Sequence, residues 1–206
     1  MSRLQTLDAA RVVDHAMEVF WTRGYEGTSV DDLAHQLGVG PEDLHEVYGD
    51  KHGLFLRALE RYRDAQARSL APALLSEGLV LPRIRAIMLG YLQLAAEEAE
   101  PRGCLIANTA GEVLPGDPAV ADCLAEVLSV VEDGFLQGLQ HAVDHGELPE
   151  GLDLAGNAAM LTMLLQGLQV LVKLDPDPLR LTPAVDAALA GLDALSRGTA
   201  PVPAPR

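Results

Sequence analysis

The sequence predicts an all-α fold of about nine helices, with a small N-terminal helix-turn-helix domain followed by a larger helical domain. Apolar residues recur at three- and four-residue spacing through most of the chain, and no segment shows a sustained strand-like alternation. Glycine or proline marks each break between the periodic segments. With 206 residues, 49% of them hydrophobic, the chain is long enough for these two modules.

The first helix is expected to begin after Thr6, which is suited to an N-cap, and to end at Gly24. Val13, Met17 and Phe20 recur along it at helical spacing. These three side chains are therefore expected on its inward face.

Two short helices joined by a tight turn follow the first helix. Thr28 or Ser29 caps the first of the pair, and Gly38 closes it. Gly40 and Pro41 open the second, because proline at the first helical position loses no needed hydrogen bond. The inward side chains are expected to be Val30, Leu33, Leu37, Leu44, Val47 and Tyr48. Two helices in this arrangement are typical of a helix-turn-helix reader of duplex DNA.

A long fourth helix, about residues 50–75, is expected to connect the two modules. The larger module should hold five more helices, separated by breaks rich in proline and glycine. The predicted domains are 1–50 for the helix-turn-helix and 76–197 for a helical regulatory and dimerisation domain. Residues 198–206 carry too little apolar surface to fold and are expected to form a disordered tail.

The charge balance limits the partners that the chain can bind. Its formal net charge is −15, which argues against general affinity for nucleic acid or anionic membranes. The first 50 residues contain ten acids and three arginines, so binding to DNA must be local and specific. The expected recognition helix carries Glu42, Asp43 and Glu46. These acids either accept a hydrogen bond from cytosine N4 in the major groove or are solvated residues that begin a helix.

The helix expected over about 154–174 is apolar nearly all round. A helix buried on one side only would show a polar stripe, so a second chain is expected to cover its far face. The last helix offers a similar apolar stripe, and a four-helix homodimer contact is the resulting prediction. The residues assigned to this contact are Leu161, Leu165, Leu168, Val172, Leu189 and Leu192.

The compartment is expected to be the cytoplasm. The first ten residues lack the apolar core of a signal peptide, and polar residues interrupt the most apolar run, 158–174, before it could span a bilayer. Cys104 and Cys123 then lie in a reducing environment and are interpreted as packing residues, with a redox switch as the less favoured alternative.

Residues 16–62 contain four motifs in register: an aromatic-x-x-x-Gly-Tyr end of helix one, a Thr-Ser cap, Leu-Gly-Val at the turn and Gly-x-Lys-x-Gly-Leu at the start of helix four. With these motifs the block resembles the DNA-binding domain of TetR-family transcriptional regulators. PRGCLIANTAGE, residues 101–112, and Gly-Glu-Leu-Pro, residues 146–149, resemble the regulatory domain of one subgroup. The resemblance implies a repressor that binds operator DNA as a symmetric dimer and releases it when a small molecule enters the second module.

The same resemblance indicates which residues contact DNA. His45 stands where such regulators usually have a phosphate-contacting tyrosine, and Lys51 begins the fourth helix. Hydroxyl and amide donors near a helix start position a protein on phosphates without reading sequence. The DNA-binding candidates are Thr28, Ser29, Gly40, Glu42, Asp43, His45, Glu46 and Lys51.

Four interior glycines, Gly90, Gly134, Gly138 and Gly167, each cost about 1 kcal/mol relative to alanine in a helix. Close helix packing is one explanation, and a ligand cavity is the other. The cavity would suit an apolar or amphipathic effector. Its predicted lining is Met88, Tyr91, Leu92, Cys104, Asn108, Met160 and Leu164.

Other functions find little support in the sequence. No phosphate-binding glycine loop or nucleophile motif occurs, so no enzyme and no cofactor are predicted. His141 and His145 have a metal-compatible spacing, but no third ligand is apparent, and no metal site is predicted. The alternative function is a dimer of the TetR fold that senses a ligand or binds a protein and has lost DNA binding through its acidic recognition helix.

Overall fold

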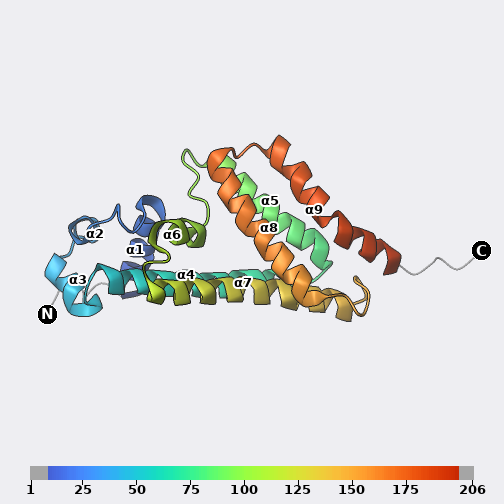
Figure 1. The fold of residues 1–206 in the computed structure, drawn as a ribbon, viewed down its shortest axis with the longest axis horizontal. Coiled ribbons are helices and arrows are strands. Elements are labelled where there is room, and N and C mark those ends of the chain that lie inside the picture. Colours follow the sequence, from blue (N-terminus) through green and yellow to red (C-terminus); the bar gives the residue numbers. More distant parts are fainter. Residues whose placement is uncertain (1–8, 200–206) are drawn as a thin grey trace, which may run out of the picture. The chain divides into compact units, whose positions relative to one another are not determined.

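The computed structural model describes residues 9–199, and this part of the chain folds into nine helices without a strand (Figure 1). The all-α prediction is thereby confirmed. The helices are α1 (Ala9–Arg23), α2 (Val30–Leu37), α3 (Pro41–Tyr48), α4 (Lys51–Leu74), α5 (Val80–Glu97), α6 (Leu105–Val113), α7 (Pro118–Asp144), α8 (Leu154–Leu174) and α9 (Pro178–Thr199). The predicted Thr6 cap and residues 200–206 of the predicted tail lie outside the described residues. Gly198 and Thr199, also assigned to the tail, are helical.

The chain forms two compact units that do not follow its linear order. Unit 1 contains the residues up to Gln66 together with Cys104–Ser129, and unit 2 contains Ala67–Gly103 and the residues from Val130 onward. Helices α4 and α7 each contribute residues to both units. The contacts thus group α6 with the helix-turn-helix, whereas the sequence placed it in the second domain. The functional boundaries 1–50 and 76–197 stay a prediction.

An aromatic cluster anchors the core of unit 1. The rings of Phe20 in α1 and Phe55 in α4 meet edge to face with centroids 4.9 Å apart. Trp21 and Tyr62 form a second edge-to-face pair at 5.3 Å. Pairs of this geometry contribute beyond the area they bury, by about 0.5–1.5 kcal/mol each. The start of α4 is therefore packed firmly against α1.

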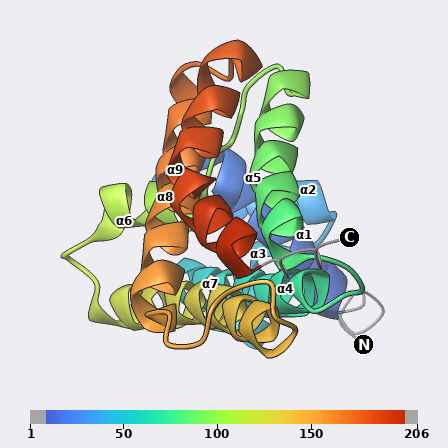
Figure 2. The same ribbon diagram turned by 90° about the vertical axis from the view of Figure 1, so that its right-hand side faces the viewer.

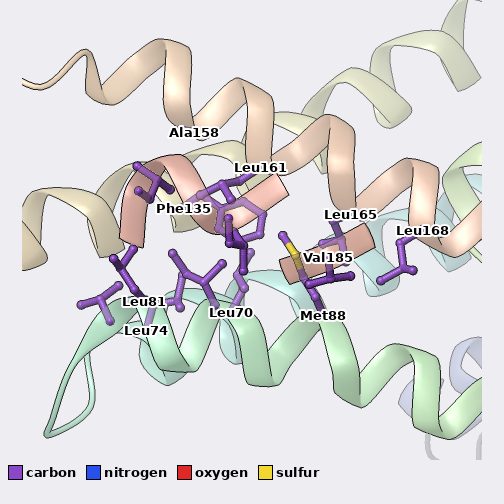
Figure 3. Packing of buried hydrophobic residues seen from close by; sticks show 14 of the residues in the cluster. Leu70, Leu74, Leu81, Met88, Phe135, Ala158, Leu161, Leu165, Leu168 and Val185 are labelled. Atoms are coloured by element: carbon purple, nitrogen blue, oxygen red, sulfur yellow. The ribbon is translucent and has the colours of Figure 1, made fainter. Parts of the chain in front are cut away.

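In unit 2, helices α5, α8 and α9 lie side by side (Figure 2). Their inward faces pack with the later parts of α4 and α7, and Figure 3 shows Leu70, Phe135 and Leu161 from α4, α7 and α8 meeting in this core. All three side chains are almost completely buried. The hydrophobic effect of this burial is the main stabilisation of the unit.

Glu147, in the loop between α7 and α8, caps α5 from a distance. Its carboxylate accepts hydrogen bonds from the N–H groups of Val80 at 2.6 Å and Leu81 at 2.9 Å. The N-cap residue Leu79 has no side chain that could do this. A carboxylate at a helix N-terminus also interacts favourably with the helix dipole. This contact gives the Gly-Glu-Leu-Pro segment a structural role.

Two of the four interior glycines are explained by close packing within unit 2. A Cβ at Gly134 would lie 3.0 Å from the Leu70 side chain, and one at Gly138 would lie 3.0 Å from Leu74. Turns of α7 thus approach α4 closely at both positions. A Cβ at Gly90 or Gly167 would meet nothing within 4 Å. Packing inside one chain does not explain these two glycines.

The predicted dimer residues are buried inside the single chain, and this corrects their assignment. Each is at most 4% exposed and belongs to the core of unit 2. The residues concerned are Leu161, Leu165, Leu168, Val172, Leu189 and Leu192. A side chain that already fills its own core cannot also cover a partner.

A different stripe of α8 faces outward. Met163, Val170, Leu171 and Leu174 are exposed apolar residues, and Met163 is 70% exposed. Gly167 lies on the same stripe, one turn after Met163. Helix α8 also has the length and apolar composition of a membrane span, two properties that buried core helices share.

Candidate nucleic-acid interface

The helix-turn-helix is built by local capping, as the sequence predicted. Ser29 is the N-cap of α2, and its hydroxyl accepts the N–H of Asp32 at 3.0 Å. Gly38 ends α2 in the left-handed conformation, with φ +67°, which glycine adopts without strain. Gly40 is the N-cap of α3, and Pro41 occupies the first turn.

The buried side chains of α2 and α3 are Leu33, Ala34 and Leu44, and all three belong to the core of unit 1. The outward face of α3 consists of Glu42, His45, Glu46 and Val47, all exposed. The prediction that Val47 points inward is wrong, because its side chain is 54% exposed. The outward face therefore offers two carboxylates, one imidazole and one apolar side chain.

Asp43 is set apart from the other two acids of α3. Its carboxylate accepts the N–H of Gly40, the N-cap residue, at 3.1 Å. The side chain is half-buried, unlike those of Glu42 and Glu46. Asp43 therefore stabilises the start of the helix, and its assignment as a DNA contact stays a prediction.

Two predicted backbone anchors are engaged inside unit 1. Thr28 is 1% exposed, and its hydroxyl donates to the carbonyl of Gly24 at 2.7 Å. Lys51 donates from Nζ to the carbonyl of Tyr25 at 3.1 Å, and its ammonium lies 4.1 Å from the centre of the Tyr25 ring. Thr28 is thus unavailable to phosphate, and Lys51 positions the turn after α1.

Ser29 is exposed, but its hydroxyl also has a partner. It donates to the Asp32 carboxylate at 2.7 Å. This hydrogen bond is the largest cause that holds the pKa of Asp32 below its usual range. An ionised carboxylate therefore stays beside the cap of α2, where it stabilises the helix start.

The arginines nearest to the helix-turn-helix in α4 are also paired with acids. Arg57 contacts Glu60 at 2.8 Å, and Arg61 contacts Asp14 of α1 at 2.5 Å. Such exposed pairs contribute little to stability, about 0–1 kcal/mol. They do reduce the positive charge that these guanidinium groups offer to phosphate. The acidic balance of the first 50 residues is therefore not offset by a basic surface on the start of α4.

Two family models match the chain in the same order as its predicted modules. "Bacterial regulatory proteins, tetR family" matches residues 12–58, and "Tetracyclin repressor-like, C-terminal domain" matches residues 80–188. The chain belongs to the TetR family. The motifs that suggested this from sequence fall inside the two matched segments.

Curated relatives of this TetR-family protein are transcriptional regulators. An uncharacterized HTH-type transcriptional regulator of Bacillus subtilis (strain 168), YezE, is 34% identical over 194 residues, covering 94% of this chain and 100% of YezE. The HTH-type transcriptional repressor ComR of Escherichia coli (strain K12) is 27% identical over 169 residues, covering 82% and 80%. The family is thus one of regulatory proteins that include repressors.

A solved structure places a relative on DNA. A cysteine mutant of the TetR family transcriptional regulator CifR, in complex with a 26-bp double-strand operator, is 28% identical to this chain with a TM-score of 0.77. The similarity covers 89% of this chain and 96% of the CifR chain. CifR therefore shares both the helix-turn-helix and the arrangement of the later helices.

The seven residues predicted to bind an effector fall in different units of this TetR-family chain. Cys104 and Asn108 belong to unit 1, and the other five, Met88, Tyr91, Leu92, Met160 and Leu164, belong to unit 2. Leu92 also lines a pocket of about 320 Å³ at α5 and the start of α9. The effector site as a whole stays a prediction.

The two cysteines fit the interpretation as packing residues. Cys104 is buried at the N-cap of α6. Burial, followed by the nearby carboxylates of Glu126 and Glu60, raises the pKa of the half-buried Cys123 thiol. A raised pKa disfavours the thiolate, which is the reactive form. The local electrostatics of Cys123 therefore oppose a role in thiol redox chemistry.

The two histidines with a metal-compatible spacing lie together at the end of α7. The ring centroids of His141 and His145 are 4.0 Å apart, and Nδ1 of His145 lies 2.8 Å from the carbonyl of His141. Within residues 9–199, no group of three metal-type side chains surrounds them. The two rings thus contact each other, and His145 also contacts the backbone of α7.

Proposed function

We propose that this protein is a ligand-responsive transcriptional repressor that binds operator DNA as a homodimer in the cytoplasm and has no enzymatic activity. The observation that carries the proposal is the outward face of α3, which an intact capped helix-turn-helix presents to solvent. In this motif the second helix enters the major groove. The operator complex of CifR supports the same use of the fold.

The outward side chains of α3 suggest which base pairs the helix recognises. Carboxylates accept a hydrogen bond from cytosine N4, and apolar side chains contact the thymine methyl group. Glu42 and Glu46 supply the first kind of contact, and Val47 supplies the second. His45, also exposed, is a donor to phosphate in either charge state through one ring nitrogen. The operator is therefore proposed to hold C·G and T·A pairs in each half-site.

The homodimer is proposed to use the exposed stripe of α8 rather than the stripe first assigned. Met163, Val170 and Leu174 present large apolar side chains, while Gly167 between them leaves room for close approach. The outward residues of α9 include small side chains such as Ala187 and Ala190. Large residues on one helix and small ones on its neighbour suit an interface that repeats about a two-fold axis.

The effector is proposed to be a small apolar or amphipathic molecule bound by unit 2. The support is chemical: the predicted residues of this unit, such as Met88 and Leu164, are apolar, and Tyr91 adds one hydroxyl. Pockets of this composition favour guests with a large apolar surface. Binding of the effector is proposed to release the operator.

One observation favours a second function. The two carboxylates on the outward face of α3 repel phosphate, and the start of α4 provides no unpaired arginine among Arg57, Arg61 and Arg63 to offset them. A dimer that senses a ligand or binds a protein, without DNA, is the corresponding alternative.

A mobility-shift titration of the purified dimer on the DNA upstream of its own gene separates the two functions. The repressor gives saturable retardation that survives moderate salt and excess unrelated duplex. Retardation that is absent even at low salt supports the alternative, because the electrostatic contribution to binding is largest there.

A further inference from the structure

The turn between α1 and α2 is held by a side chain from α6. Oε2 of Glu112 accepts the N–H of Tyr25 at 2.8 Å, and Oε1 accepts the N–H of Glu26 at 2.7 Å. Hydrogen bonds from N–H groups to an ionised acceptor are stronger than those between neutral groups. Both partners lie in unit 1, so the contact is internal to the unit that contains the helix-turn-helix.

Gly24 makes this contact possible. Its φ is +79°, a conformation that side-chain-bearing residues rarely adopt. A Cβ at this position would lie 2.8 Å from Oε1 and 2.9 Å from Oε2 of Glu112. Glycine therefore provides both the backbone conformation and the space for the carboxylate. The Gly-Tyr pair that ends α1 and the glutamate that ends PRGCLIANTAGE, two separate sequence motifs, meet at this point.

The same turn is held from α4. The carbonyl of Tyr25 accepts from Nζ of Lys51, and the Tyr25 ring packs against Phe55 with centroids 4.7 Å apart. Thr28, which precedes the α2 cap Ser29, closes the turn through its hydroxyl on Gly24. The residue at the centre, Tyr25, thus has its N–H bound by α6 and its carbonyl and ring bound by α4.

We infer that Glu112 is a positioning residue for DNA binding. Its carboxylate fixes the turn at Gly24, Tyr25 and Glu26, and this turn sets where α2 begins and how α2 presents α3. The inference rests on the proposed operator binding. Any change in α6 that withdraws the carboxylate leaves two backbone N–H groups without their acceptor and loosens the base of the helix-turn-helix.

The sign of the effect distinguishes positioning from simple electrostatics. Removing a negative charge from so acidic a chain favours association with DNA through reduced repulsion. Removing the acceptor of the turn has the opposite effect, because the recognition helix loses its fixed orientation. A variant without the Glu112 carboxylate is therefore predicted to bind the operator more weakly, despite its more favourable charge.

The experiment compares Glu112→Ala and Glu112→Gln with Asp122→Asn. Asp122 is an exposed acid of α7 in the same unit, so its substitution removes the same charge as Glu112→Gln without touching the turn. Amide hydrogen exchange at Tyr25 and Glu26 is measured by NMR in the free dimer, and operator affinity is measured by fluorescence anisotropy. Glu112→Ala is expected to speed exchange at both amides, because both lose their acceptor, and to weaken operator binding about tenfold. Glu112→Gln, which keeps one carbonyl acceptor, is expected to lie between Glu112→Ala and the wild type.

The two readouts keep the inference separate from the proposed function. If Glu112→Ala speeds exchange at Tyr25 and Glu26 but the wild-type protein binds no operator, the proposed operator function is overturned. The role of Glu112 in holding the turn then still stands. Exchange and affinity of Glu112→Ala equal to those of Asp122→Asn overturn the inference. If Glu112→Ala fails to fold, Glu112→Gln decides by the same two measurements, and unchanged exchange and affinity in that variant contradict the positioning role.

Discussion

Asp43 directs its carboxylate back to the N–H of Gly40, 3.1 Å away, and thereby closes the N-terminus of α3. This contact divides the three acids of the recognition helix. Asp43 stabilises the helix, whereas Glu42 and Glu46 face outward. The acidic character of α3 is thus partly structural, because one of its three carboxylates stabilises the helix start.

The cap predicts a loss of stability when Asp43 is removed. Asp43→Ala is expected to lower the free energy of unfolding by about 0.5–2 kcal/mol, because the capping hydrogen bond and the charge at the helix start are both lost. Glu46→Ala, in the last turn of the same helix, serves as the control and should be nearly neutral. Urea denaturation measures both variants. Equal stability of the two would show that the hydrogen bond between Asp43 and Gly40 contributes nothing.

The outward acids predict base-specific recognition. Glu42→Ala is expected to lose about 1–3 kcal/mol of discrimination at one base pair of each half-site while leaving the other positions unchanged. Affinities for a set of singly substituted operators measure this. Asp31→Asn, an exposed acid at the start of α2, removes a charge without a base contact and should tighten binding to every sequence equally. A uniform tightening by Glu42→Ala as well would mean that this acid only repels phosphate.

The exposed stripe of α8 predicts the site of dimerisation. Met163→Glu is expected to yield a folded monomer, since Met163 is 70% exposed in the single chain and contributes little to its core. Leu94→Glu changes an exposed leucine of α5 and should leave the dimer intact. Sedimentation equilibrium gives the mass, and circular dichroism checks the fold. A dimer that persists in Met163→Glu would place the interface elsewhere.

Close packing of α7 against α4 predicts that replacing Gly138 by alanine lowers stability, although alanine favours helices. Gly138→Ala gains about 1 kcal/mol in helix propensity, but its Cβ would lie 3.0 Å from Leu74, and overpacking costs about 1–3 kcal/mol. A net loss of stability is therefore expected. At Gly90, where a Cβ meets nothing within 4 Å, alanine should be stabilising. Thermal unfolding of both variants measures the difference, and a stabilised Gly138→Ala would contradict the packing.

The Asp117 carboxylate predicts a pH dependence of stability. The N–H of Val120, at 3.1 Å, and then the His52 ring, at 2.7 Å, hold the pKa of Asp117 below its usual range. A carboxyl group whose pKa is lowered by folding stabilises the protein at pH values above its unfolded-state pKa of about 3.9. This stabilisation is lost as the pH falls through the folded-state pKa. Asp117→Asn should thus be less stable than wild type at neutral pH. Urea titrations should show this gap closing below about pH 4, and a gap that stays constant would contradict the shift.

The parts of the fold that local chemistry determines were predictable from sequence. Ser29, Gly38 and Pro41 occupy the cap and turn positions assigned to them, because each acts on backbone groups within a few residues. Contacts across long sequence separations were not predictable. Nothing in the sequence near Glu112 or Glu147 indicates which distant amides their carboxylates accept.

The surface of α8 shows a second limit of sequence reasoning. The helix is apolar nearly all round, so its periodicity gives two equivalent stripes, one through Leu161 and Leu165 and one through Met163 and Gly167. Only the neighbouring helices decide which stripe fills the core of the chain. Thr28 and Lys51 likewise have side chains that could donate to phosphate, but in the structure both donate to backbone carbonyl groups inside unit 1.

Operator binding by α3 can be tested by selecting binding sites from random-sequence duplexes with the purified wild-type dimer. A two-fold symmetric sequence is expected to be enriched, with half-sites separated by about one or more whole helical turns of 10–10.5 bp and a C·G pair that is no longer selected by Glu42→Ala. An intact dimer that leaves the pool random at low salt would contradict operator binding by α3.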